Sequence, residues 1–382
     1  MQCLFGRVIY TGKEVLEDGY IAFAGREIES VSATAQGELL GSFEVLTPAF
    51  IDAHSHIGLI RSGEPESEAE VNEQQDSLLT LTDALDSLQM DDQALQEATE
   101  MGVLYSCILP GSGNILGGKA AVIRHFASDS TRAFVGRAGL KAAFGYNPRS
   151  TQSWEGTRPS TRMGAVGLLR KKLLEVQDKQ ERFAAADEEK RQDITFSAEE
   201  KVICSILDGT CVLRTHVHKV DDIAALLRLK DELGLKVTVE HAMDVNQSEI
   251  LSELKKREIP VVYGPMEAFA YKVELKHESW RNVSHLIQSG VEIGLMTDHP
   301  VTPARQLLLQ TRWFLRHGWS KQQAIELVSR HNASILGVEA SLGTLEQGKW
   351  ASVVGWNGDP FDLGSFPTAV YGEGRLIAKA GD

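Results

Sequence analysis

The sequence lacks the features that would mark it as a membrane, secreted or nucleic-acid-binding protein. No apolar run approaches the ~18–20 residues of a membrane span. Residues 1–15 lack the basic, apolar and small-residue order of a secretion signal. The four cysteines form no CxxC pair, which is typical of reduced thiols in a cytosolic protein. The net charge of −14 disfavours nucleic acid and anionic membranes as partners. We therefore expect a cytoplasmic protein that acts on a small molecule.

A phosphate-binding loop is also missing. The glycines at positions 111, 113, 117 and 118 are close together, but no GK[ST] sequence follows them. A P-loop needs that lysine and hydroxyl to contact the phosphates and their metal ion. We interpret these glycines as a tight loop close to a pocket.

The chain divides into a mixed middle and two similar ends. Its 382 residues suit a large barrel with a smaller appendage. Residues 1–48 and 345–382 contain short strand-like runs and turns, which predicts one small β-sandwich domain built from both termini. Residues 49–344 alternate strand-like and helical runs. About eight parallel βαβ units of this kind predict an α/β fold with a TIM-type (β/α)8 barrel.

One segment interrupts that alternation. From about residue 161 to 201 the apolar residues have helical spacing at first, and the segment then becomes densely charged. A solvated helical insertion is the simplest interpretation. A lid over the barrel mouth and a contact within a homo-oligomer are the alternatives.

Two histidines one residue apart end the first strand-like run of the middle segment, LTPAFIDAHSHIGL (46–59). Residues i and i+2 of a strand point to the same side, so His54 and His56 can reach one ion. Such a pair is weak evidence alone, and would more often be structural. Other strand-like runs, however, end in His216 and His218, in His241, and in Asp298.

These residues are expected to meet, because the C-terminal ends of parallel barrel strands lie on one face. Neutral imidazoles and a carboxylate suit zinc or a similar divalent ion. We therefore predict a metal site with one or two divalent ions per chain.

Lys141 lies in AGLKAAFGYNPRS (138–150), a run of small and apolar residues where an unpaired ammonium would be costly. It either pairs with a barrel carboxylate or carries a CO₂-derived carboxyl group that bridges two ions. We favour the bridge, because an ammonium would repel the ions that the histidines collect. Lys119 is the competing candidate, and its alternative role is to contact the substrate.

These motifs together resemble the amidohydrolase superfamily over nearly the whole chain. TPAFIDAHSH is similar to its first-strand motif, and RTHVHKVDDI, VEHA and LMTDHPVTP to those of the fifth, sixth and eighth strands, in the style of the imidazolonepropionase-related branch. GLKAAFGYNPRS resembles the segment around the carboxylated lysine of isoaspartyl dipeptidase. SLGTLEQGKWASVVGWNGDP resembles the C-terminal motif that re-enters the small β domain.

The resemblance implies a role for each matching residue. His54 and His56 would bind one metal ion, His216 and His241 a second, and Lys141 would bridge them. Asp298 would be both a ligand and the catalytic proton shuttle. Two departures occur: Ser352 stands where the family usually has Asp, and Lys219 stands where family deaminases have Glu. The first concerns packing between domains, and the second disfavours base or nucleoside deamination.

The expected reaction is hydrolysis of a C–N bond in an amide, cyclic amide or dipeptide-like substrate. The alternatives are ring opening or deamination with one metal ion, and an inactive scaffold. Position alone suggests four substrate contacts, namely Lys119, Tyr146, Arg149 and His218, of which His218 is alternatively a metal ligand. An arginine at the barrel mouth could hold a substrate carboxylate, although a loop salt bridge is equally compatible.

Overall fold

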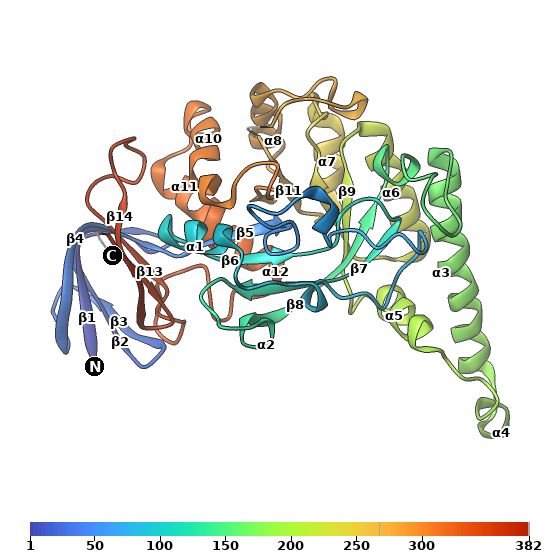
Figure 1. The fold of residues 1–382 in the computed structure, drawn as a ribbon, viewed down its shortest axis with the longest axis horizontal. Helices are drawn as coiled ribbons and strands as arrows, with labels where there is room; N and C mark the ends of the chain where they lie inside the picture. Colours follow the sequence, from blue (N-terminus) through green and yellow to red (C-terminus); the bar gives the residue numbers. More distant parts are fainter. Residues whose placement is uncertain (267, 381–382) are drawn as a thin grey trace.

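The computed structural model describes residues 1–266 and 268–380. Its strands form two sheets (Figure 1). One has seven strands in the order β15-β14-β13-β4-β1-β2-β3, and the other has eight in the order β12 to β5. The expected α/β barrel with a β domain drawn from both termini is confirmed.

The seven-stranded sheet combines the two ends of the chain. Its strands are β1 (Gln2–Tyr10), β2 (Val15–Ala24), β3 (Glu27–Ser32), β4 (Glu38–Pro48), β13 (Val353–Trp356), β14 (Pro367–Gly372) and β15 (Arg375–Lys379). The sheet curls around its own core. The rings of Phe23 on β2 and Tyr371 on β14 lie 6.3 Å apart, although three other strands lie between β2 and β14 in the sheet. This domain packs against the barrel through a buried hydrogen bond of 2.7 Å between Tyr105 and Ser352.

The barrel strands are β5 (Phe50–Ser55), β6 (Val103–Ile108), β7 (Leu116–Arg124), β8 (Phe134–Ala143), β9 (Leu213–Val217), β10 (Val237–His241), β11 (Val261–Tyr263) and β12 (Ile293–Leu295). The alternation of strands and helices predicted that all eight strands are parallel. This prediction is wrong for one strand, because β7 runs antiparallel to both β6 and β8. Only the glycine-containing segment 109–115 joins β6 to β7. A connection so short permits an antiparallel pair, whereas a parallel crossover needs about a dozen residues or more.

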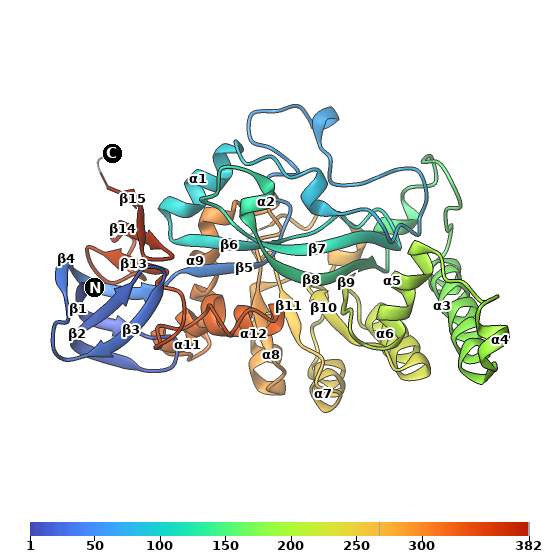
Figure 2. The ribbon, with the colours of Figure 1, turned by 90° about the horizontal axis from the view of Figure 1, so that it is seen from below.

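Helices cover the outside of the barrel, and α6, α7 and α8 lie in a row along one side (Figure 2). The helices are α1 (Gln93–Glu100), α2 (Ser130–Ala133), α3 (Arg162–Ala185), α4 (Glu188–Arg191), α5 (Ala198–Leu207), α6 (Val220–Leu233), α7 (Ser248–Lys256), α8 (Val283–Ser289), α9 (Leu307–Gln310), α10 (Arg312–Arg316), α11 (Lys321–Glu326) and α12 (Asn332–Leu336). Helix α6 illustrates the local rules: it buries Ile223, Leu226 and Leu227 on one face and ends at Gly234 in the left-handed conformation.

The charged segment at 161–201 is helical, with α3 and α4 projecting away from the barrel (Figure 1). Helix α3 buries Ala165, Leu169, Leu173 and Val176, and it buries no residue after Val176. Its first half therefore packs on the barrel, and its second half is solvated. Among the described residues, no helix combines the length and apolar character needed to cross a membrane.

Asn332 closes the barrel between its first and last strands. Its Nδ2 donates to the carbonyl of Ile51 on β5 and to that of Leu295 on β12, while its Oδ1 accepts from the amide of Leu295. The Asn332 side chain is fully buried, so no solvent can replace these bonds. One amide group thus satisfies backbone groups of both edge strands at the seam.

We expect Asn332→Ala to lower the free energy of unfolding by about 2–3 kcal/mol, because it leaves buried backbone groups without partners. Chemical denaturation followed by circular dichroism measures this change. Ser334→Ala, at an exposed position of the same helix, is the matched control and should be neutral. Equal stability of the two variants would contradict a role for Asn332 in closing the barrel.

Candidate metal centre

The strand ends bring the expected residues together at one end of the barrel. His54 lies on β5, Lys141 on β8, His216 on β9 and His241 on β10, while Asp298 follows β12. The ring of His241 lies 4.9 Å from that of His54 and 4.3 Å from that of His216, centroid to centroid. His54 and Asp298, which lie 244 positions apart in the chain (298 − 54), therefore share one site.

Hydrogen bonds at Nδ1 fix the orientation of three imidazoles. Nδ1 of His54 lies 2.9 Å from Glu240 Oε2, Nδ1 of His56 lies 2.8 Å from the carbonyl of Leu109, and Nδ1 of His241 lies 2.9 Å from the carbonyl of Gly264. Because these oxygens only accept, Nδ1 carries the hydrogen and Nε2 is the free nitrogen. This second layer of contacts is typical of histidines that bind a metal ion.

The free nitrogens face one carboxylate. Oδ1 of Asp298 lies 3.4 Å from His54 Nε2 and 3.2 Å from His56 Nε2. Desolvation opposes the charge of Asp298, but its interactions with the imidazoles of His241 and His56 hold the pKa of this carboxyl well below its usual range. Asp298 is thus an ionised group in a largely water-free site, available as a ligand or a proton acceptor.

Burial lowers the pKa of four of these imidazoles and keeps them neutral, which is the form that binds metal ions; they are His54, His216, His218 and His241. Desolvation lowers the pKa of His54 to about 4, assisted by the neighbouring Lys141 charge, and lowers the pKa of His218 to about 3. Nε2 of His241 is buried with no hydrogen-bond partner among the described residues. A neutral ring nitrogen left without a partner in a cluster of donors fits a divalent ion.

Lys141 is completely buried, and its Nζ lies 3.0 Å from His54 Nε2. Desolvation lowers the pKa of this amine to about 8, although the Asp298 and Glu240 charges act in the opposite direction. The Lys141 ammonium therefore contacts Nε2 of His54, the nitrogen that a metal ion would need.

The donors form two overlapping groups. His54, His241 and Asp298 offer ligand atoms within 4.8 Å of one another, and so do His216, His218 and His241. Sequence reasoning left His218 between ligand and substrate contact. The structure places it in the second group, and its Nδ1 is buried without a hydrogen-bond partner among the described residues.

The three other suggested substrate contacts, Tyr146, Arg149 and Lys119, do not belong to the two donor groups. The backbone amide of Tyr146 donates to Glu274, and its side chain is largely exposed. Nε of Arg149 donates to the carbonyl of Gly145. Lys119 lines a separate cavity of about 620 Å³ together with Leu140, Cys211 and other residues that are not part of the histidine cluster.

Sequence reasoning missed Glu240, which binds both His54 and Arg214. Alternation along β10 predicts that Glu240 and His241 point to opposite sides. Both reach the centre, because His241 and Ala242 adopt positive φ angles of 80° and 55° and turn the chain at the strand end. Such backbone strain in residues other than glycine is characteristic of functional sites.

Sequence reasoning also missed Asn147, Lys272 and Glu274. The Asn147 side chain contacts His216 and Lys272, while Lys272 pairs with Glu274. All three lie in the segments that follow β8 and β11. They have no periodic spacing that would have distinguished them from ordinary loop residues.

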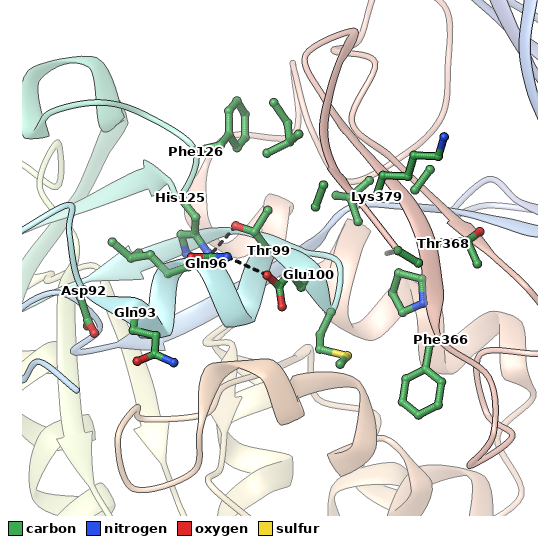
Figure 3. A pocket seen from close by; sticks show the side chains of 18 of the residues that line it. Asp92, Gln93, Gln96, Thr99, Glu100, His125, Phe126, Phe366, Thr368 and Lys379 are labelled. Atoms are coloured by element: carbon green, nitrogen blue, oxygen red, sulfur yellow. Dashed lines mark hydrogen bonds between the residues drawn. The ribbon is translucent and has the colours of Figure 1, made fainter. Parts of the chain in front are cut away.

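A small cavity adjoins the centre. Its polar lining comes from His218, Tyr271, Lys272, Glu278 and Asp298, and its apolar lining from Met243, Pro265, Ala268, Leu275 and Val301. A wider cavity of about 690 Å³ lies between α1 and strands β14 and β15, with Phe126 and Phe366 on its walls (Figure 3). His54, His56, His216 and His241 do not line this wider cavity, so the metal chemistry is not located there.

Comparisons with known proteins agree with this arrangement. Amidohydrolase tasK of Hapsidospora irregularis is 25% identical over 357 residues, which cover 86% of this chain and 36% of that protein. The chain thus spans about a third of the length of this curated relative.

Two solved structures share the fold at low identity. An A. niger ochratoxinase has a TM-score of 0.61 and 16% identity, and covers 100% of this chain and 96% of its own. A Xaa-Pro dipeptidase with bound methionine has a TM-score of 0.58 and 14% identity, with coverage of 98% and 99%.

The crystal structure of an amidohydrolase from Thermotoga maritima MSB8 is much closer. It has a TM-score of 0.92 and 30% sequence identity, and the match covers 99% of this chain and 100% of that one. The model of the amidohydrolase family matches residues 179–376, which is just over half of the chain. The chain therefore belongs to the amidohydrolase family.

Proposed function

We propose that this protein is a metal-dependent hydrolase of C–N bonds that acts on an amide, a cyclic amide or a dipeptide-like substrate. The observation that carries the proposal is the position of Asp298, whose carboxylate faces Nε2 of His54 and Nε2 of His56 beside a small cavity. A proton acceptor beside two metal-binding nitrogens is the arrangement that hydrolysis by an activated water requires.

The donor set suits one or two divalent ions, with zinc favoured by its imidazole and carboxylate ligands. His54, His56 and Asp298 would hold one ion, His216 and His241 a second, and Lys141 would lie between them. Bound ions would polarise the carbonyl of the substrate and make a water molecule acidic enough to lose a proton near pH 7. Asp298 Oδ1 would accept that proton and deliver it to the leaving nitrogen.

The position of Lys141 supports its modification. An ammonium 3.0 Å from His54 Nε2 would repel a divalent ion at that nitrogen. The ammonium would first lose one proton; the neutral amine would then attack CO₂, forming a nitrogen–carbon bond and releasing a second proton, so that the cation becomes an anionic carbamate. The change removes the repulsion and adds two oxygens that could bridge two ions.

The cavity beside the centre indicates which substrates to test first. Its walls include the apolar side chains of Met243, Leu275 and Val301 near Asp298, which favour an apolar group next to the scissile bond. The fold shared with a Xaa-Pro dipeptidase makes dipeptides a reasonable class to include. We infer that acyl-amino acids, cyclic amides and dipeptides with an apolar residue are the best candidates.

Asp298→Asn should lower kcat by about 10²–10⁴-fold, because the amide cannot accept and return a proton. The measurement is turnover of a panel of dipeptides and acyl-amino acids at saturating zinc, with circular dichroism to confirm folding. Asp221→Asn, which changes an exposed residue in the first turn of α6, is the control. Turnover within a factor of about two of the wild type would exclude Asp298 as the proton shuttle.

Lys141→Ala should lower the metal content from two ions per chain to one or fewer, because the bridging group is lost. Elemental mass spectrometry of protein expressed with zinc or manganese measures this directly. Lys119→Ala tests the competing lysine and should retain both ions. One ion per chain in the wild type and in Lys141→Ala would exclude Lys141 as a bridging ligand. It would favour ring opening or deamination with a single ion.

Glu240→Gln should weaken zinc binding by about 10–100-fold, because the carboxylate behind His54 orients this ligand and increases its basicity. Competition with a chelator of known affinity gives the change. Glu249→Gln, at an exposed position of α7, is the matched control. A loss of thermal stability with unchanged zinc affinity would assign Glu240 a purely structural role.

A further inference from the structure

One oxygen of Glu274 is the meeting point of three positively charged or metal-binding groups. Oε1 lies 2.9 Å from Lys272 Nζ, 3.6 Å from His216 Nε2 and 3.9 Å from His218 Nε2. The Glu274 side chain is fully buried, and the geometry of these contacts leaves Oε1 without a hydrogen bond among the described residues. A buried carboxylate requires a counter-charge, and Lys272 supplies it in this structure.

The position of Lys272 depends on a loop residue from elsewhere in the barrel. Its Nζ lies 3.2 Å from Oδ1 of Asn147, and Nδ2 of Asn147 lies 3.3 Å from His216 Nε2. Only 9% of the Lys272 side chain is exposed, although its neighbours Tyr271 and Val273 are largely exposed. The lysine is thus turned inward and held against the second group of donors.

We propose that Lys272 is a built-in cation that competes with the second divalent ion for Glu274, and that Glu274 and His218 complete the donor set of His216 and His241. This inference rests on the proposed function, since it concerns the second ion of that centre. It also adds one carboxylate and one imidazole to the residues that the motifs identified.

Electrostatics supports the competition. The ammonium of Lys272 and a divalent ion are both attracted to Glu274 Oε1, but like charges a few ångströms apart in a buried site repel each other strongly. Lys272 Nζ and the imidazoles of His216 and His218 already converge on the same oxygen, Glu274 Oε1. The second ion therefore binds only as Lys272 withdraws from Glu274.

The order of metal binding follows from this competition. The first position, formed by His54, His56 and Asp298, faces the ammonium of Lys141, whose charge is removed by carboxylation in the proposed function. The second position must displace Lys272 each time it fills. Its affinity for zinc is set by Lys272 and Glu274 in opposite directions.

The test is a titration of metal-free protein with zinc alone, by isothermal titration calorimetry in the presence of a competing chelator, with stoichiometry from elemental mass spectrometry. Lys272→Met should raise the affinity for the second ion by about tenfold or more, and Glu274→Gln should lower it by a similar factor. Lys276→Met removes an exposed lysine from the same loop and should change neither affinity.

The double variant Lys272→Met/Glu274→Gln removes the buried pair together, so it also serves if either single variant folds poorly. Its second-ion affinity should equal that of Glu274→Gln, because Lys272 has nothing to compete for once the carboxylate is gone. An effect of Lys272→Met that is equally large with and without Glu274 would show general charge repulsion and overturn the competition.

The outcomes separate the two proposals. Unchanged or weaker second-ion affinity in Lys272→Met overturns the competition. A wild type that binds one ion and hydrolyses amides, with Lys272→Met also binding one, overturns it while the proposed function stands. A wild type that binds no zinc defeats the proposed function, and this inference with it.

Discussion

The seam between the first and last barrel strands is the constraint on which the metal centre depends. The amide of Asp298 donates to the carbonyl of His54, and the amide of His56 donates to the carbonyl of His299. Thr297 donates to Asp52 through its amide and its hydroxyl. These bonds hold the end of β12 against the end of β5, which places the Asp298 carboxylate beside Nε2 of His54 and Nε2 of His56. Without this closure the same residues would lie at opposite edges of an open sheet.

Paired charges make such a polar centre tolerable inside the protein. Arg214 faces Glu240, Lys272 faces Glu274, and the Asp298 charge acts on Lys141. Burial of an isolated charge would be very unfavourable, whereas oppositely charged neighbours compensate for the lost water. Lys272 is the member of these pairs whose place at Glu274 a divalent ion would take in the proposed competition.

Much of the centre follows from local sequence, and the physical reason is the regularity of strands. A strand places His54 and His56 on related sides, and parallel strands of a barrel end on one face, so spacing and order suffice to propose that His216, His241 and Asp298 converge. The reversal of β7 did not alter this, because the histidines and Asp298 lie at the ends of β5, β9, β10 and β12, which pair in parallel with their neighbours.

The sequence by itself determined the α/β class, the use of both termini in one β domain, and the residue types that suit a divalent ion. The tertiary structure decided which groups stand behind and beside those residues. Glu240 reaches His54 only because the chain turns sharply at His241, and Lys272 reaches Glu274 and Asn147 only because two loops fold over the same barrel end. Periodicity describes residues within one strand or helix. Contacts between loops depend on how separate elements pack, and no local pattern encodes that packing.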